Sequence, residues 1–192
     1  MANVPKREEA YALLTEYNKN EGLVKHALAV EAVMLHFAEL FNEEDLEKWG
    51  VIGLVHDLDY EMYPEEHCKK TQEILVAKDW PEDYIHAIVS HGWKLCFDVE
   101  PVERMEKVLY TIDELTGLIA ATALMRPSKS ILDTEVKSVK KKWKSKGFAA
   151  GVNRDVIQEG ADMLGMELSE VIKETIIGMR NVAESIGLQG DN

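Results

Sequence analysis

A histidine and an aspartate stand side by side within an apolar stretch of the sequence. His56 and Asp57 lie in the segment VIGLVHDLDY, directly after two apolar residues and before a third. Burying a carboxylate without a partner is costly, so such a group becomes neutral or pairs with a cation. We therefore predict that Asp57 has a cationic partner.

Four further residues of metal-ligand type lie elsewhere in the chain, at His26, His67, His91 and Asp113. Each is expected at a helix end or on a helix stripe that faces the core, and each comes from a different helix. Helical bundles build metal sites in this way, from inward-facing side chains on several helices. Mixed imidazole and carboxylate ligands suit iron, manganese, zinc, cobalt or nickel better than calcium. The pattern predicts one or two divalent transition metals.

Other polar residues near these positions allow two interpretations each. Asp59 could orient a histidine ligand, or it could be a solvated loop acid. Lys69 and Lys70 could contact a substrate phosphate, although exposed lysines are common. His36 and His86 are predicted to be structural or surface residues, since neither shares a helix face and level with the expected ligands.

The elements that must position these side chains are helices, because helical apolar spacing covers almost the whole chain. The expected helices span residues 6–20, 23–41, 42–58, 65–79, 82–92, 101–125, 135–147, 153–165 and 168–187. Asn42 is expected to be the N-cap of the third helix. Gly50 and Gly53, one turn apart, suit the close approach of a neighbouring helix. No alternating strand pattern occurs, so we predict an all-α protein.

The composition changes beyond Pro127, where a lysine-rich helix is expected. Seven lysines lie between positions 129 and 146. We predict that they form a solvated helix face, although such a run could also attract an anionic substrate or a nucleic acid. Residues 1–192 are predicted to form a single domain, with a core to about residue 126 and a helical C-terminal extension over 127–192.

Composition and charge exclude several classes of function. The net charge of −13 argues against sequence-independent binding of nucleic acid, which needs a basic surface. Cys68 and Cys96 form no C-x-x-C pair, which favours a reducing cytoplasm over a disulfide framework. No signal region or membrane span is recognisable. We expect a cytoplasmic protein, and the sequence leaves a homo-oligomer open.

The order of His26, His56, Asp57 and Asp113 resembles the H…HD…D signature of the HD superfamily of metal-dependent phosphohydrolases. The resemblance covers roughly residues 20 to 120, and its specificity comes from the ordered set rather than from the HD dipeptide. It implies an HD-type helical bundle. The extension after residue 127 is not part of the shared core.

Two further segments resemble those that supply the second metal in two-metal members of this superfamily. They are HCKKTQEIL, which begins at His67, and AIVSHG, which contains His91. Members that cleave cyclic di-GMP carry a double histidine at the position of His91, followed by a Gly-Tyr-Pro motif. Here Gly92 and Trp93 follow His91 instead, which counts against that substrate.

The resemblance implies hydrolysis of a small phosphorylated substrate, such as a nucleotide, as a phosphomonoesterase or phosphodiesterase. Asp57 would bridge two metals, which would be completed by His26, His56 and Asp113 on one side and by His67 and His91 on the other. A metal-bound hydroxide would attack phosphorus in line. If one metal is bound, His67 would act as a general acid instead. Two alternatives stay open: a di-iron oxygenase of the HD type, and a non-catalytic metal-binding sensor or interaction module.

Overall fold

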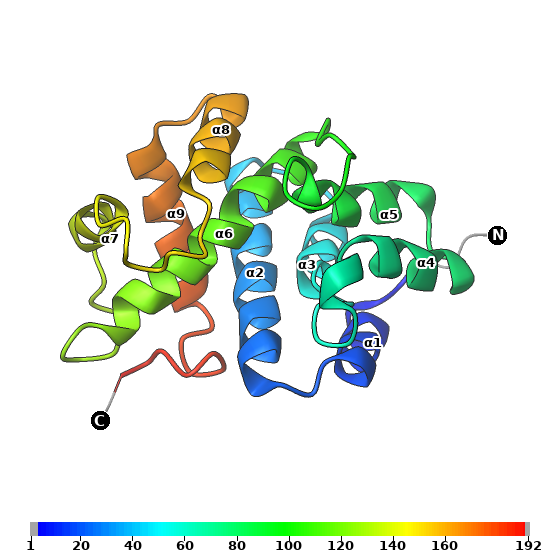
Figure 1. Cartoon of the computed structure of the whole chain (residues 1–192), viewed down its shortest axis with the longest axis horizontal. Helices are drawn as coiled ribbons and strands as arrows, with labels where there is room; N and C mark the ends of the chain where they lie inside the picture. The colour runs from blue at the N-terminus through cyan, green and yellow to red at the C-terminus, as the bar shows by residue number, and fades with distance from the viewer. Residues whose placement is uncertain (1–3, 191–192) are drawn as a thin grey trace.

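The computed structural model describes residues 4–190, which fold into helices joined by short loops (Figure 1). The α-helices are α1 (Arg7–Tyr17), α2 (Glu21–Leu40), α3 (Leu46–Val55), α4 (Lys69–Ala77), α5 (Glu82–Val89), α6 (Arg104–Leu124), α7 (Val136–Trp143), α8 (Arg154–Leu164) and α9 (Leu168–Arg180). Two 3₁₀ turns, η1 (Pro64–Glu66) and η2 (Ser90–Gly92), precede α4 and follow α5. Residues 4–190 contain isolated β-bridges but no β-strand. The predicted all-α class is confirmed.

Side chains at the helix starts explain where α2 and α3 begin. The Asn20 side chain accepts hydrogen bonds from the first backbone N–H groups of α2, and Asp45 accepts one from Lys48 N at the start of α3. The prediction that Asn42 caps α3 is wrong. Asn42 instead has a left-handed backbone, with φ of 55°, in the turn that follows α2. Asparagine adopts this conformation more readily than most residues, so it suits the turn.

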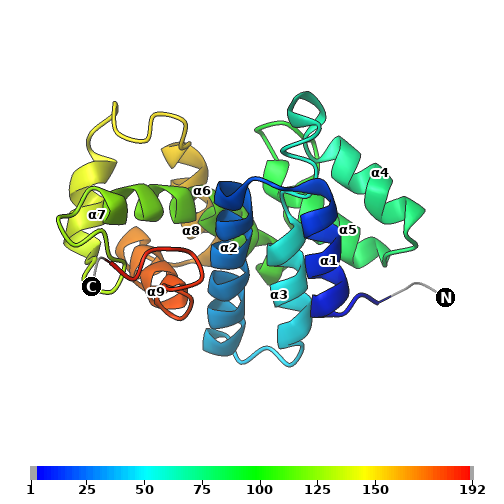
Figure 2. The ribbon, with the colours of Figure 1, turned by 90° about the horizontal axis from the view of Figure 1, so that it is seen from below.

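Helix α2 lies at the centre of the molecule and packs against α3 on one side and α9 on the other (Figures 1 and 2). Its buried side chains include Val30, Val33 and Phe37, all without exposed surface. A Cβ atom on Gly53 of α3 would lie 2.8 Å from Met34 Cγ and 3.2 Å from Val30 O. The expected close approach of a neighbouring helix at Gly53 is therefore confirmed, and it brings the end of α3 close to α2.

The C-terminal extension packs directly on the first part of the chain. Ile157 of α8 and Ile172 and Met179 of α9 are fully buried, in the same apolar cluster as Phe37 of α2. Burying each such side chain contributes about 1.5–3 kcal/mol. The extension thus shares one hydrophobic core with the helices that precede it.

Helix α6 crosses the molecule diagonally and links the two sides of the fold (Figure 1). It packs against α2, α8 and α9, and its N-terminal half contacts α5 and η2. Side chains from α2, the end of α3 and α6 can therefore meet in one place. No helix in residues 4–190 combines the length and the apolar character that a membrane span requires.

Candidate metal centre

His56 and Asp57 follow the last residue of α3, where the helix leaves carbonyl groups without intrahelical partners. The fully buried His56 uses its Nδ1–H to donate to Gly53 O at 2.7 Å. Its Nε2 faces the centre of the site, 3.3 Å from carboxylate oxygens of both Asp57 and Asp113, and finds no hydrogen-bond partner among the described residues. A buried nitrogen of this kind suits a bound cation.

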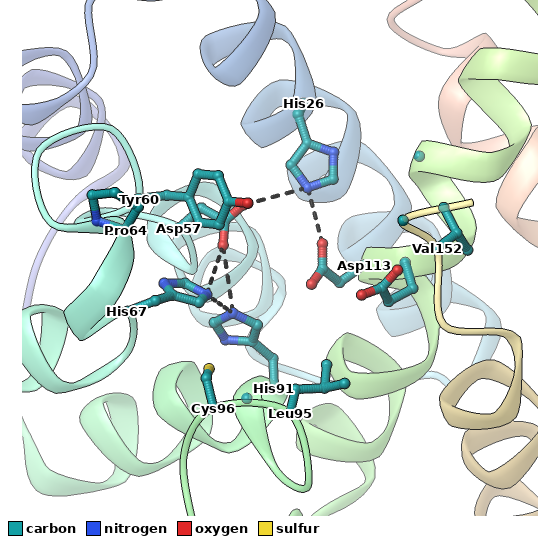
Figure 3. A pocket seen from close by; sticks show the side chains of 14 residues that line it. His26, Asp57, Tyr60, Pro64, His67, His91, Leu95, Cys96, Asp113 and Val152 are labelled. Carbon is teal, nitrogen blue, oxygen red and sulfur yellow. Dashed lines mark hydrogen bonds and ion pairs between the residues drawn. The ribbon is translucent and has the colours of Figure 1, made fainter. Parts of the chain in front are cut away.

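Three further side chains converge around this nitrogen of His56. His26 comes from α2 and Asp113 from the middle of α6, and His26 Nε2 lies 2.9 Å from Asp113 Oδ1 and 3.7 Å from Asp57 Oδ2 (Figure 3). One ligand atom from each of His26, His56, Asp57 and Asp113 lies within 4.8 Å of the others. We call these four residues the first ligand group.

The other oxygen of Asp57 faces two further histidines. Asp57 Oδ1 lies 3.3 Å from His67 Nε2 and 3.5 Å from His91 Nε2 (Figure 3). The two Nε2 atoms are 3.1 Å apart. We call Asp57, His67 and His91 the second ligand group. Asp57 thus offers one oxygen to each group, and the two groups together could hold one or two transition metals.

Hydrogen bonds behind the second group fix both imidazole rings. His67 donates from Nδ1 to Asp59 Oδ1 at 2.7 Å, and His91 donates from Nδ1 to Ile88 O at 2.5 Å. Asp59 is fully buried, so it is not a solvated loop acid, and its other oxygen accepts from Thr71 N at 2.8 Å. These contacts leave both Nε2 atoms facing the centre, as metal ligands require.

Two ligands lie in breaks between helices rather than within them. His67, expected in the first turn of a helix, lies between η1 and α4, because Cys68 has a left-handed backbone with φ of 65° and α4 starts only after it. His91 lies in η2, just after α5 ends at Val89. Apolar periodicity does not reveal such short breaks, so the predicted helices over 65–79 and 82–92 run through them.

At each ionisable group of the cluster, burial and the neighbouring charges have opposite effects on the pKa, and the charges outweigh burial. Burial opposes protonation of His56, but Asp57 and Asp113 outweigh it and raise the pKa of His56 well above its ordinary value. Burial also opposes ionisation of Asp57, but the neighbouring His56, His91 and His26 lower the pKa of Asp57 well below its usual range. The pKa of Asp113 falls for the same reason, against its burial, through His56 and His26. Ionised carboxylates here attract a proton or a metal ion.

The two ligand groups, apart from the fully buried His56, form the floor of a cleft of about 420 Å³. Its walls include Tyr60, whose ring meets His67 edge to face at a centroid distance of 5.2 Å, together with Pro64 and Leu95. Among the residues that the structure describes, none of those lining the cleft is a lysine or an arginine. A negatively charged ligand would therefore need metal ions for charge compensation.

One wall of the cleft comes from the C-terminal extension, which lies outside the part of the chain that carries the resemblance to the HD superfamily. Gly151 and Val152 line it, next to Glu114 of α6. Glu114 accepts a hydrogen bond from Asn153 N at 3.0 Å, and burial and the nearby Asp113 raise the pKa of Glu114. The sequence offers no signal for this contact, because Asn153 lies 39 positions after Glu114, at the end of the loop that precedes α8.

The loop that carries this wall is held by one arginine. The guanidinium of Arg154 donates to five backbone carbonyls, those of Trp143, Ser145, Phe148, Ala149 and Val152, at 2.6–3.4 Å. A planar group with five donors can bind several carbonyls at once, which a lysine cannot. Arg154 therefore determines the shape of the loop, and so of one side of the cleft.

The remaining predicted residues lie away from the floor of the cleft. Lys69 pairs with Glu66 at 3.1 Å and Lys70 with Glu73 at 2.7 Å, and neither lines the cleft, so their role as substrate ligands stays a prediction. His36 and His86 each bind a glutamate, Glu174 and Glu106 respectively, both at 2.7 Å.

Comparisons of the chain with protein-family models, with curated proteins and with solved structures found no match. The site is therefore interpreted from its own geometry: a shared carboxylate, two ligand groups and a cleft above them.

Proposed function

We propose that this protein is a metal-dependent phosphohydrolase with an HD-type helical bundle, acting on a small phosphorylated substrate such as a nucleotide. The observation that carries the proposal is the position of Asp57. Its Oδ2 lies beside His26 and His56, and its Oδ1 lies beside the second ligand group. A carboxylate that can bridge two ions suits phosphoryl transfer.

The chain's own residues would prepare the site for this reaction. Bound divalent metals would supply an activated water and neutralise the phosphoryl oxygens. Asp59 keeps the ring of His67 in place, and Gly53 O does the same for His56. Pro64, Leu95 and Val152 give the cleft apolar walls that limit the access of water. These hydrogen bonds orient the ligand rings before a substrate enters, which favours electrostatic stabilisation of the transition state.

With a single metal in the first group, His67 would instead serve as the general acid. Burial opposes its protonation, but the hydrogen bond to Asp59 and the charge of Asp57 raise the pKa of His67. A protonated Nε2 in the cleft could donate its proton to the leaving ester oxygen. In this version Asp57 and His67 remain the residues closest to the reaction.

The lining of the cleft favours a substrate with one phosphate group over a polyphosphate. Its described residues include no lysine or arginine, while Glu114 adds a further acidic group beside the first ligand group. Charge on a second or third phosphate would therefore lack a partner. Hydroxyl or amino groups on the rest of the substrate could donate to Glu114.

Element analysis of the purified protein, combined with phosphate release from a panel of phosphoesters in several divalent metals, tests the proposal. Wild type should hold a transition metal, and Asp57→Ala should lose both metal and activity, because Asp57 serves both ligand groups. His86→Ala, which alters a histidine away from the cleft, is the matched control and should keep both.

Four outcomes would contradict this function. A wild type that is free of metal and cannot be reconstituted removes its basis, as does full metal content in Asp57→Ala. Oxygen consumption by an iron-loaded protein without phosphate release would assign a di-iron oxygenase instead. Metal binding with neither activity would leave a sensor or interaction module.

A further inference from the structure

The two cysteines of the chain meet beside the second ligand group. Cys68 Sγ and Cys96 Sγ lie 3.7 Å apart, although the residues are 28 positions apart in the sequence. Cys68 is fully buried, whereas Cys96 is exposed and lines the cleft. A ligand that enters the cleft can therefore reach this pair of thiols through Cys96.

A tight turn holds the two sulfur atoms together. The carbonyl of Gly92 accepts hydrogen bonds from the backbone N–H groups of Leu95, Cys96 and Phe97 at 2.9–3.0 Å, which folds this segment back on itself. A Cβ atom on Gly92 would lie 2.7 Å from Cys68 Sγ and 2.9 Å from Cys96 Sγ. Only glycine leaves room for both sulfur atoms over this position, so the local backbone is adapted to the thiol pair.

A histidine completes a set of three soft or borderline donors. One nitrogen of His67 and the sulfur atoms of Cys68 and Cys96 all lie within 4.8 Å of one another. Two thiolates bound to a tetrahedral zinc ion, each at about 2.3 Å, are separated by about 3.8 Å. The sulfur atoms here are already 3.7 Å apart, whereas a disulfide would need them to move to about 2.0 Å.

We infer that Cys68, Cys96 and His67 form a further binding site, for a thiophilic divalent ion such as Zn²⁺ or Cd²⁺, which has His67 in common with the second ligand group. Thiolate ligands select such ions over Mn²⁺ or Mg²⁺, which prefer oxygen. Binding would deprotonate both thiols and release their protons to solvent. The exposed side of Cys96 leaves room for water as the fourth ligand, from the cleft.

This site competes with the second ligand group, because they share His67. The Nδ1 of His67 is bonded to Asp59, so only its Nε2 can bind an ion, and it can bind one ion at a time. An ion on the thiols would withdraw His67 from Asp57 and His91. If the proposed phosphohydrolase function is correct, a thiophilic ion therefore inhibits it without displacing the metal of the first group.

Titration of the Mn²⁺-loaded protein with Cd²⁺ tests the site. A thiolate–Cd²⁺ complex gives an ultraviolet charge-transfer band, which Cd²⁺ on histidines and carboxylates alone does not give. We expect the band to saturate at one Cd²⁺ per chain and to be lost in Cys68→Ser and in Cys96→Ser. Because Cys96 is exposed, its variant should fold even if that of the buried Cys68 does not. Tyr60→Phe changes the cleft wall but not the thiols, and should keep the band.

Absence of the band in wild type with two free thiols would overturn the inference, and so would a band that persists in Cys96→Ser. Loss of both free thiols in air without added metal would identify a disulfide pair instead. The band is independent of catalysis, so it can appear in a protein that hydrolyses no phosphoester. In that case the thiol site stands and the proposed function fails. Cd²⁺ inhibition of wild type but not of Cys96→Ser would establish the competition for His67.

Discussion

His67 Nε2 and His91 Nε2 lie 3.1 Å apart, and in each ring the other nitrogen, Nδ1, is fixed as a hydrogen-bond donor. Both Nδ1 atoms must donate, one to the carboxylate of Asp59 and the other to the carbonyl of Ile88. Neutral rings would therefore bring two lone pairs face to face. A positive charge between them, either a proton or a metal ion, relieves this repulsion, and Asp57 Oδ1 stands 3.3 Å and 3.5 Å away to share it.

Removing either of these histidines should empty one metal position and leave the other. We expect His67→Ala and His91→Ala each to lose about one metal per chain and to keep the other, since the first ligand group stays intact. Hydrolysis should fall by several orders of magnitude, because the reaction is proposed to need both metals. Element analysis and single-substrate kinetics measure both effects. His36→Ala and His86→Ala are the controls, because their rings bind glutamates away from the cleft floor. Unchanged metal content in the His67 and His91 variants would favour a one-metal site.

Asp59→Asn should weaken the second metal position although Asp59 is not a ligand. His67 Nδ1–H and Thr71 N–H donate to different oxygens of Asp59, and asparagine replaces one of these oxygens with an NH2 group, which would face a donor instead of accepting from it. Losing such a supporting contact typically lowers metal affinity by about 10–100-fold. Metal titration of the variant measures this, with the exposed Asp98→Asn as control. Equal affinity in both variants would show that Asp59 does not orient His67.

Metal binding should become stronger as the pH rises. In the metal-free protein Asp57 and Asp113 raise the pKa of His56, against the effect of its burial. This pairing stabilises the fold below the ordinary pKa of histidine and is lost as the pH rises through the raised value. A metal ion needs the neutral ring, so it must displace this proton at low pH. We expect the increase in Tm on adding metal to grow as the pH rises toward the raised pKa of His56. An increase in Tm that does not depend on pH would contradict this prediction.

Arg154→Lys should loosen the cleft wall while keeping the charge. A lysine cannot reach five carbonyls, and hydrogen bonds to charged groups contribute about 1.5–3 kcal/mol each. We expect a higher KM with a smaller change in kcat, together with faster hydrogen exchange over residues 145–152. Lys146→Ala, an exposed change in the same loop, is the control. An unchanged KM together with unchanged exchange would separate this loop from substrate binding.

The lysine-rich helix α7 should not take part in the chemistry. Lys140 donates to Ser169 on the surface and Lys142 lies over the ring of Phe148, and neither lines the cleft. We expect Lys140, Lys141 and Lys142 changed together to Glu to leave kcat within a few-fold of wild type. Any effect on substrate capture should fade with salt, because charges beyond about 10 Å are largely screened at 0.1 M. A salt series of steady-state kinetics decides this, and a large, salt-insensitive loss of kcat would place α7 at the active site.

Apolar periodicity predicted the helices well because most of them bury one face in a shared core. It could not show that Asn42 and His67 lie outside the helices. Asn42 itself has a left-handed backbone, and so does Cys68, the residue after His67, so α3 and α4 each start later than predicted. The first ligand group was expected from residue types, and the structure brings its four members together. The contribution of Val152 to the cleft and the pairing of Cys68 with Cys96 were not expected, because these contacts depend on loops and loops leave no periodic signal.

His56 and His91 reach the centre by the same local device. Each ring donates to the carbonyl three residues earlier, Gly53 O or Ile88 O, in the last turn of its helix. The ligand and the group that orients it are therefore encoded within four consecutive residues. If such a tetrapeptide were placed at the C-terminal end of another buried helix, the same local hydrogen bond would again make Nδ1 the donor and orient the ring. Metal sites in unrelated helical bundles could be built by choosing which helix ends converge, without designing a separate support for each histidine.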